Sequence, residues 1–120
     1  MRTHKDLDVW KASMEMVTKM YVVTGNFPKT EMYGLTNQMR RAAVSVPSNI
    51  AEGAGRNSSK EFLQFLYYAI GSLSELETQL IIAHNLKYIE NDQKQDMDIL
   101  FNSLFKMLSG LIQSIKKRIS

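Results

Sequence analysis

Four basic side chains near the centre of the sequence are the residues best suited to bind a ligand: Arg40, Arg41, Arg56 and Lys60. Between positions 36 and 51 the only charged residues are Arg40 and Arg41, so their positive charge is unopposed there. A guanidinium group is planar and binds two phosphate oxygens at once, which suits arginine to RNA or DNA. We predict that the four residues form a small nucleic-acid-binding cluster; a solvated helix face is the alternative.

Residues for other kinds of chemistry are sparse. The chain has no cysteine, and only His4 and His84 are available to activate a serine. We expect His84 to be a partly exposed structural residue. A di-iron bundle needs a histidine three residues after a glutamate on two helices, and neither histidine has that spacing. We therefore expect no catalytic residue, no cofactor, no metal site and no enzyme activity.

Two further sets of charged residues are weaker candidates. Lys116, Lys117 and Arg118 form a basic run, but basic residues at a helix C-terminus often only complement the helix dipole. Glu52 and Glu75 are candidates to form ion pairs inside the bundle with Arg40, Arg41 or Arg56.

Composition limits the possible classes of protein. The 120 residues suit one domain, and a hydrophobic share of 44% is enough for a core. The net charge of +3 mildly favours an acidic partner. No signal peptide or membrane span is recognisable, and the absence of cysteine suits a reducing compartment, so we expect a cytoplasmic protein.

Apolar residues recur every three or four positions along most of the chain, which predicts helices at about 7–25, 36–54, 58–86 and 91–118. The third helix has the strongest pattern. It begins after Ser58 with a capping box and continues along Phe62, Leu66, Ala69, Leu73, Leu76, Leu80 and Ala83. Four helices with short connections predict an all-α domain over residues 1–120, an antiparallel up-down-up-down four-helix bundle.

Details of the other segments complete this prediction. In the first helix we expect the core stripe to consist of Leu7, Trp10, Met14, Val17 and Tyr21. The connection after it should pack Phe27, Met32 and Tyr33 against the end of the bundle.

Two residues that disfavour helices interrupt the pattern. Pro47 predicts a kink in the second helix, because proline removes a backbone hydrogen bond; two helices meeting at Pro47 are the alternative. Gly71 in the third helix predicts close approach of another helix, either within the chain or across a subunit boundary.

The central motifs resemble those of the bacterial 23S rRNA intervening sequence proteins, often called S23 ribosomal proteins. The resemblance is carried by EMYGLTNQMRRAAVSVPSNIAEGAGR at 31–56, KEFLQFL at 60–66 and GSLSELETQL at 71–80. It extends to Leu7–Trp10 and Tyr88–Ile89. The family's motif positions in this sequence are Gln38, Arg40, Arg41, Ser45, Pro47, Asn49, Glu52, Gly53, Arg56, Glu61, Phe62, Gly71, Ser72 and Glu75. The resemblance implies that most of them fix helix packing or an oligomer interface.

The resemblance implies a four-helix bundle without catalytic residues. The family is similar to the accessory variability determinant proteins of diversity-generating retroelements, which assemble as pentameric rings and bind nucleic acid and a reverse transcriptase. We therefore expect a homo-oligomer, a pentamer by resemblance, that binds RNA or DNA. The alternative is an interaction scaffold that recruits a partner such as a reverse transcriptase without binding nucleic acid itself. No membrane partner is expected.

Overall fold

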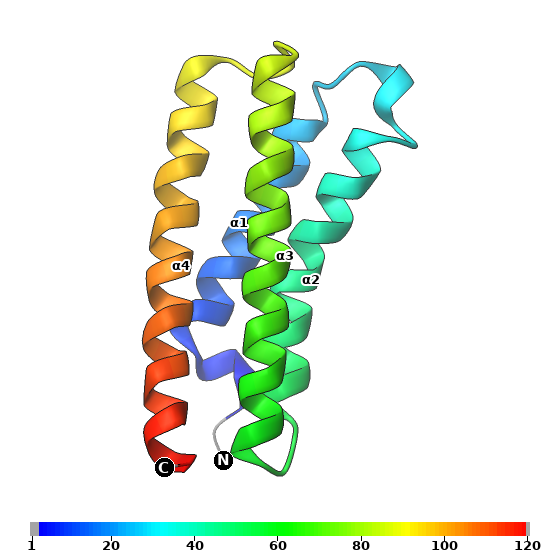
Figure 1. The fold of residues 1–120 in the computed structure, drawn as a ribbon. Coiled ribbons are helices and arrows are strands. Elements are labelled where there is room, and N and C mark those ends of the chain that lie inside the picture. The colour runs from blue at the N-terminus through cyan, green and yellow to red at the C-terminus, as the bar shows by residue number, and fades with distance from the viewer. Residues whose placement is uncertain (1–2, 120) are drawn as a thin grey trace.

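The protein is a bundle of four α-helices, seen in a computed structural model that describes residues 3–119 (Figure 1). Two short 3-10 helices, His4–Asp6 and Lys29–Glu31, precede the first and second α-helices, and no strand occurs within residues 3–119. The α-helices are α1 (Asp8–Thr24), α2 (Leu35–Ala54), α3 (Ser59–Asn85) and α4 (Asn91–Ile119). Each bound lies within one residue of the expected position. The predicted all-α four-helix fold is confirmed.

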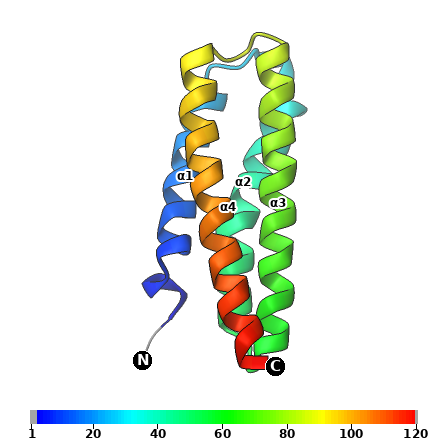
Figure 2. The same cartoon turned by 60° about the vertical axis from the view of Figure 1, so that its left-hand side comes forward.

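The bundle is elongated, with extents of 47 × 24 × 22 Å. Figures 1 and 2 show the chain turning back at each connection, so that consecutive helices run in opposite directions. We call the end that holds the α1–α2 and α3–α4 connections the upper end. The lower end holds the α2–α3 connection and the start of α1 (Figure 1). Among the helices of the described region, none is long and apolar enough to cross a membrane.

The core runs along the centre of all four helices. The expected stripe of α3 is buried along its length apart from Phe62, which is partly buried. A Ser58 hydroxyl accepts a hydrogen bond from the Glu61 backbone N–H at 3.1 Å and so caps this helix. In α4 the buried positions are Met97, Phe101, Leu104, Leu108, Ile112 and Ile115.

The core stripe of α1 differs from the expected one. Met14 and Tyr21 are each 43% exposed, whereas the buried residues are Val9, Ser13, Met16, Met20 and Thr24. The stripe was not recognised in the sequence because two of its members, Ser13 and Thr24, are polar residue types. They tolerate burial because their hydroxyls donate to backbone carbonyls, Ser13 to Trp10 and Thr24 to Met20, both at 2.8 Å.

Helix α2 continues through Pro47, which is buried inside it, so two helices meeting at Pro47 are not observed. A bend at this residue stays a prediction. Near the end of α2, Gly53 permits close approach to α3: an added Cβ would lie 2.7 Å from the Phe65 Cβ and 3.0 Å from the Phe62 Cδ1. Gly71 has no such neighbour, since nothing lies within 4 Å of its added Cβ. Close approach to Gly71 within the chain was therefore wrong, and contact across a subunit boundary stays a prediction.

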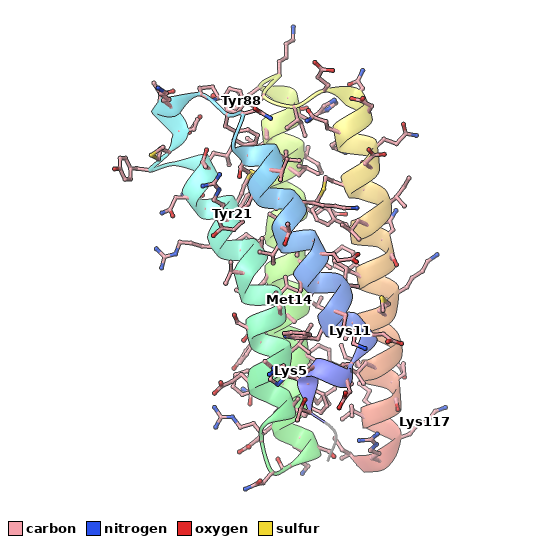
Figure 3. All side chains as sticks on the ribbon, turned by 180° about the vertical axis from the view of Figure 1, so that it is seen from behind. Lys5, Lys11, Met14, Tyr21, Tyr88 and Lys117 are labelled. Carbon is pink, nitrogen blue, oxygen red and sulfur yellow. The ribbon has the colours of Figure 1, made fainter. Side chains whose placement is uncertain are left out.

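The upper end is fastened by Glu31, which joins two connections. One carboxylate oxygen accepts from the Leu35 backbone N–H at 3.2 Å, at the start of α2. The other accepts from the Tyr88 hydroxyl at 2.8 Å, in the α3–α4 connection (Figure 3). Phe27 is buried here, with its ring centroid 5.4 Å from that of Tyr88. Met32 and Tyr33 were expected to pack here as well, but they are 54% and 92% exposed.

Candidate nucleic-acid interface on helix α2

The four predicted basic residues do not form one cluster. Arg40 and Arg41 lie in the upper part of α2, whereas Arg56 follows its lower end and Lys60 is in the first turn of α3 (Figure 1). From Arg41 to the end of α2 at Ala54, the helix extends about 20 Å at about 1.5 Å per residue. The sequence pattern found two pairs of basic residues, but the length of α2 separates them.

Arg40 is bound to the end of α1. Its Nε donates to the Thr24 hydroxyl at 2.9 Å, and a terminal nitrogen donates to the Tyr21 carbonyl at 3.3 Å. The guanidinium carbon lies 4.6 Å from the centre of the Tyr21 ring, and Figure 3 shows Tyr21 on the α2 side of α1. The last carbonyls of a helix lack intrahelical donors and form the negative end of its dipole. Arg40 therefore links the C-terminal end of α1 to α2 by hydrogen bonds.

Arg41 makes none of these contacts. It is exposed, and within residues 3–119 its guanidinium has no hydrogen bond or ion pair. It lines two neighbouring hollows, one on the outer face of α2 and one between α2 and α3. Arg41 is therefore the basic residue of α2 that is free to meet a ligand.

The outer face of α2 combines positive charge with neutral polar groups. The hollow on this face is lined by Tyr21, Asn37, Arg40, Arg41, Val44, Ser45 and Ser48. No carboxylate is among them. We call this set the outer face of α2. Guanidinium, amide and hydroxyl groups all donate hydrogen bonds to phosphate oxygens, so the surface is chemically suited to a nucleic-acid backbone.

At the lower end one of the two predicted basic residues is already paired. Arg56 pairs with Glu52 at 2.6 Å, on an exposed surface rather than inside the bundle as expected. Its guanidinium carbon also lies 5.0 Å from the centre of the Phe65 ring. Arg56 shares a hollow with Arg118 at the start of α3. The fold thus brings the C-terminal basic run to this end, a proximity that sequence spacing did not reveal. Lys60 is exposed nearby.

Sequence reasoning missed two tyrosines at the upper end. Tyr21 was assigned to the core, yet its exposed ring contacts Arg40. Tyr33 was also expected to be packed, yet it lines the hollow between α2 and α3. Aromatic residues at helical spacing usually indicate core positions. The exposure of Tyr21 could have been predicted only from the correct buried stripe of α1, which includes Ser13 and Thr24.

Other candidate chemistry gains no support from the geometry. The ring nitrogen Nε2 of His84 lies 2.7 Å from the Asn91 Oδ1. Glu75 lines the hollow between α2 and α3 together with Arg41, but no ion pair joins them. No group of three or more histidine or carboxylate side chains able to hold a metal ion occurs within residues 3–119.

Comparisons with known proteins agree with this fold. The model of the family described as 23S rRNA-intervening sequence protein matches residues 5–110. Among solved structures, a protein of unknown function from the S23 ribosomal protein family of Bacteroides thetaiotaomicron has a TM-score of 0.81. It is 21% identical, and the match covers 88% of this chain and 95% of the other, which supports the shared fold alone. No curated protein matches the chain.

Proposed function

Because the chain belongs to the family of 23S rRNA-intervening sequence proteins, we propose that it is a non-enzymatic, cytoplasmic homo-oligomer that binds RNA or DNA through phosphate contacts. One observation carries the proposal. The outer face of α2 presents Arg40 and Arg41 without a carboxylate, and Arg41 has no hydrogen bond or ion pair in the described region. Unpaired positive charge on a surface rich in hydrogen-bond donors favours a polyanion.

The basic residues have unequal roles in this proposal. Arg41 makes the main phosphate contact, and Arg40 adds positive charge while it holds α1. Arg56 and Lys60 contact a second part of the same ligand at the lower end. The two parts lie about 20 Å apart along α2. A duplex rises about 3.4 Å per base pair, so a ligand must be about six base pairs long to reach both.

Self-association is supported by the outer side of α3. Three apolar side chains of this helix, Tyr67, Ile81 and Ile82, and Leu86 directly after it are all 43–50% exposed. Gly71, between them in sequence, has open space above it. An exposed apolar surface of this kind often marks a protein interface. By resemblance the assembly is a pentamer, which would repeat the outer face of α2 in each subunit and multiply its affinity.

The same surface supports a second function. If the outer side of α3 binds a different protein, such as a reverse transcriptase, the bundle is an interaction scaffold. In that case the arginines of α2 need not contact nucleic acid at all.

The decisive experiment measures binding of labelled RNA and DNA by fluorescence anisotropy across a salt series. The variant is Arg41→Glu, and the control is Lys106→Glu, which makes the same charge change at an exposed position of α4. We expect Arg41→Glu to lower affinity about tenfold or more, because it replaces an attraction with a repulsion. Light scattering coupled to size exclusion gives the oligomeric state of each protein.

The results distinguish nucleic-acid binding from an interaction scaffold. Equal losses in Arg41→Glu and Lys106→Glu would mean that only net charge matters and that the outer face of α2 is not the site. An oligomer that ignores nucleic acid at low salt, and retains a protein partner after nuclease treatment, would favour the scaffold. A monomer would overturn self-association.

A further inference from the structure

One aromatic ring at the upper end is almost wholly exposed. Tyr33 follows the short helix Lys29–Glu31 and precedes α2, and it is 92% exposed. Within residues 3–119 it makes no hydrogen bond and no contact with another ring. An aromatic ring stabilises a fold by being buried, so this one contributes little to the bundle. Its faces are open to a ligand.

Tyr33 lies beside unpaired polar groups of α2. It lines the hollow between α2 and α3 together with Asn37 and Arg41, which are one helical turn apart on the same side of α2. Both are exposed, and neither side chain has a hydrogen bond or ion pair in the described region. They also line the hollow on the outer face of α2, where the aromatic residue is Tyr21. An exposed tyrosine therefore lies on each side of these two donors.

Cations next to exposed aromatic rings are the means by which many proteins hold single-stranded nucleic acid. The cations bind phosphates, and unpaired bases stack on the rings. The bases of a duplex already stack on one another, so a protein ring cannot reach their faces. We propose that the outer face of α2 binds a single-stranded segment of RNA or DNA, with one base stacked on Tyr33 and the adjoining phosphate at Arg41. The inference rests on the proposed function, since it names the form of nucleic acid that this site holds.

The surroundings of Tyr33 suit a nucleic acid better than a second protein. Apart from Tyr33 and Ala42, the hollow that Tyr33 lines is polar, with Asn37, Gln38, Arg41, Ser45, Glu75 and Gln79 as its other lining residues. The outer side of α3, by contrast, combines its exposed tyrosine with Ile81 and Ile82, as a protein interface does. Glu75 on the α3 side repels phosphate. The backbone of the strand therefore lies along α2, and only a base lies over the ring of Tyr33.

The test changes Tyr33 rather than Tyr21. The ring of Tyr21 is less available, because it is 43% exposed and the Arg40 guanidinium already lies over it. The variants are Tyr33→Ala, which removes the ring, Tyr33→Leu, which keeps apolar bulk without a ring, and Tyr33→Phe, which keeps the ring. All three should melt within about 3 °C of the unmodified protein, because an exposed side chain is changed.

Fluorescence anisotropy compares labelled single strands of RNA and DNA with the same strands annealed to their complements, at one low salt concentration. Tyr33→Ala and Tyr33→Leu should bind the single strands about fivefold or more weakly than the unmodified protein does. Their affinity for the duplexes should change by less than about twofold, because phosphate contacts alone hold a duplex here. Tyr33→Phe should bind both forms as the unmodified protein does.

The inference is overturned if Tyr33→Ala weakens both forms equally or weakens neither. It is also overturned if Tyr33→Leu binds single strands as tightly as the unmodified protein, because the contact is then apolar rather than stacking. A changed oligomeric state of Tyr33→Ala in light scattering would place Tyr33 in a subunit contact instead. If Arg41→Glu weakens both forms while Tyr33→Ala weakens neither, the proposed function stands without the stacked base. No binding of either form by the unmodified protein overturns both.

Discussion

The two ends of α2 carry the same kind of charge but differ in what the protein does with it. At the lower end, Gly53 lets α2 pack directly on Phe62 and Phe65, and Arg56 is paired with Glu52. At the upper end, a hollow lies between α2 and α3, and Arg41 at its edge has no hydrogen bond or ion pair among the described residues. Both ends are formed by α2 and α3, and they differ in the side chains that lie between the two helices.

This difference shows why basic residues alone are a poor guide to a binding site. An arginine whose N–H groups already have internal partners has fewer of them left to bind a phosphate. Arg40 and Arg56 both have such partners, whereas Arg41 has none in the region described. Of these three arginines, the one without an internal partner thus lies at the upper end, and the comparison can be tested there and at the lower end separately.

The largest expected effect is at the lower end. Gly53→Ala should destabilise the protein by about 2 kcal/mol, because the new Cβ would lie 2.7 Å from the Phe65 Cβ and force α2 from α3. Gly55→Ala is the matched control, since its Cβ would meet nothing closer than 3.6 Å. That control should change stability by less than about 0.5 kcal/mol. Urea unfolding measures both, and equal effects would contradict close packing at Gly53.

A smaller effect should separate the two adjacent arginines. Arg40→Ala should cost about 1 kcal/mol of stability, because it removes the donors to Thr24 and to the Tyr21 carbonyl. Arg41→Ala should leave stability nearly unchanged. In the salt series it should reduce the slope of log affinity against log salt by about one. If Arg41→Ala destabilised the protein as much as Arg40→Ala, Arg41 would have a structural role as well.

The smallest expected effect concerns the hydrogen bond between Tyr88 and Glu31 at the upper end, and it depends on pH. The hydrogen bond to Glu31 raises the pKa of Tyr88 above its ordinary value of 10.0, with burial and the Glu31 charge adding to the shift. The folded state thus favours the neutral phenol. This contribution is fully present below pH 10 and is lost as pH rises through the raised pKa.

Tyr88→Phe should therefore be less stable than the unmodified protein at neutral pH, and the difference should shrink above pH 10. Urea unfolding over this range measures it. Tyr33→Phe is the control, because the Tyr33 ring is 92% exposed at the same end. A difference between Tyr88→Phe and the unmodified protein that does not change with pH would contradict the role of the Tyr88–Glu31 hydrogen bond.

The sequence predicted the fold well because the helical period is strong. The seam from Leu66 to Ala83 and all four helix ranges were expected from the spacing of apolar residues alone. The α1 stripe was wrong for a physical reason. Ser13 and Thr24 are polar by type, but each donates to its own helix backbone and so behaves as a core residue.

The site was only partly predictable, because spacing along a chain does not show which partners fold nearby. The charge-free surroundings of Arg40 and Arg41 were visible in the sequence. The contact of Arg40 with the end of α1 joins positions 16 and 19 residues apart, and no local pattern announces it.

The order of the helices also bears on how quickly this chain folds. Within residues 3–119 each α-helix packs against the α-helix that follows it in sequence, and among the non-consecutive α-helices of this region only α1 and α4 pack together. Most native contacts therefore close short loops, and short loops lose little entropy when they close. Chains of this kind reach the native state in microseconds to milliseconds. The bundle should thus form soon after α4 leaves the ribosome.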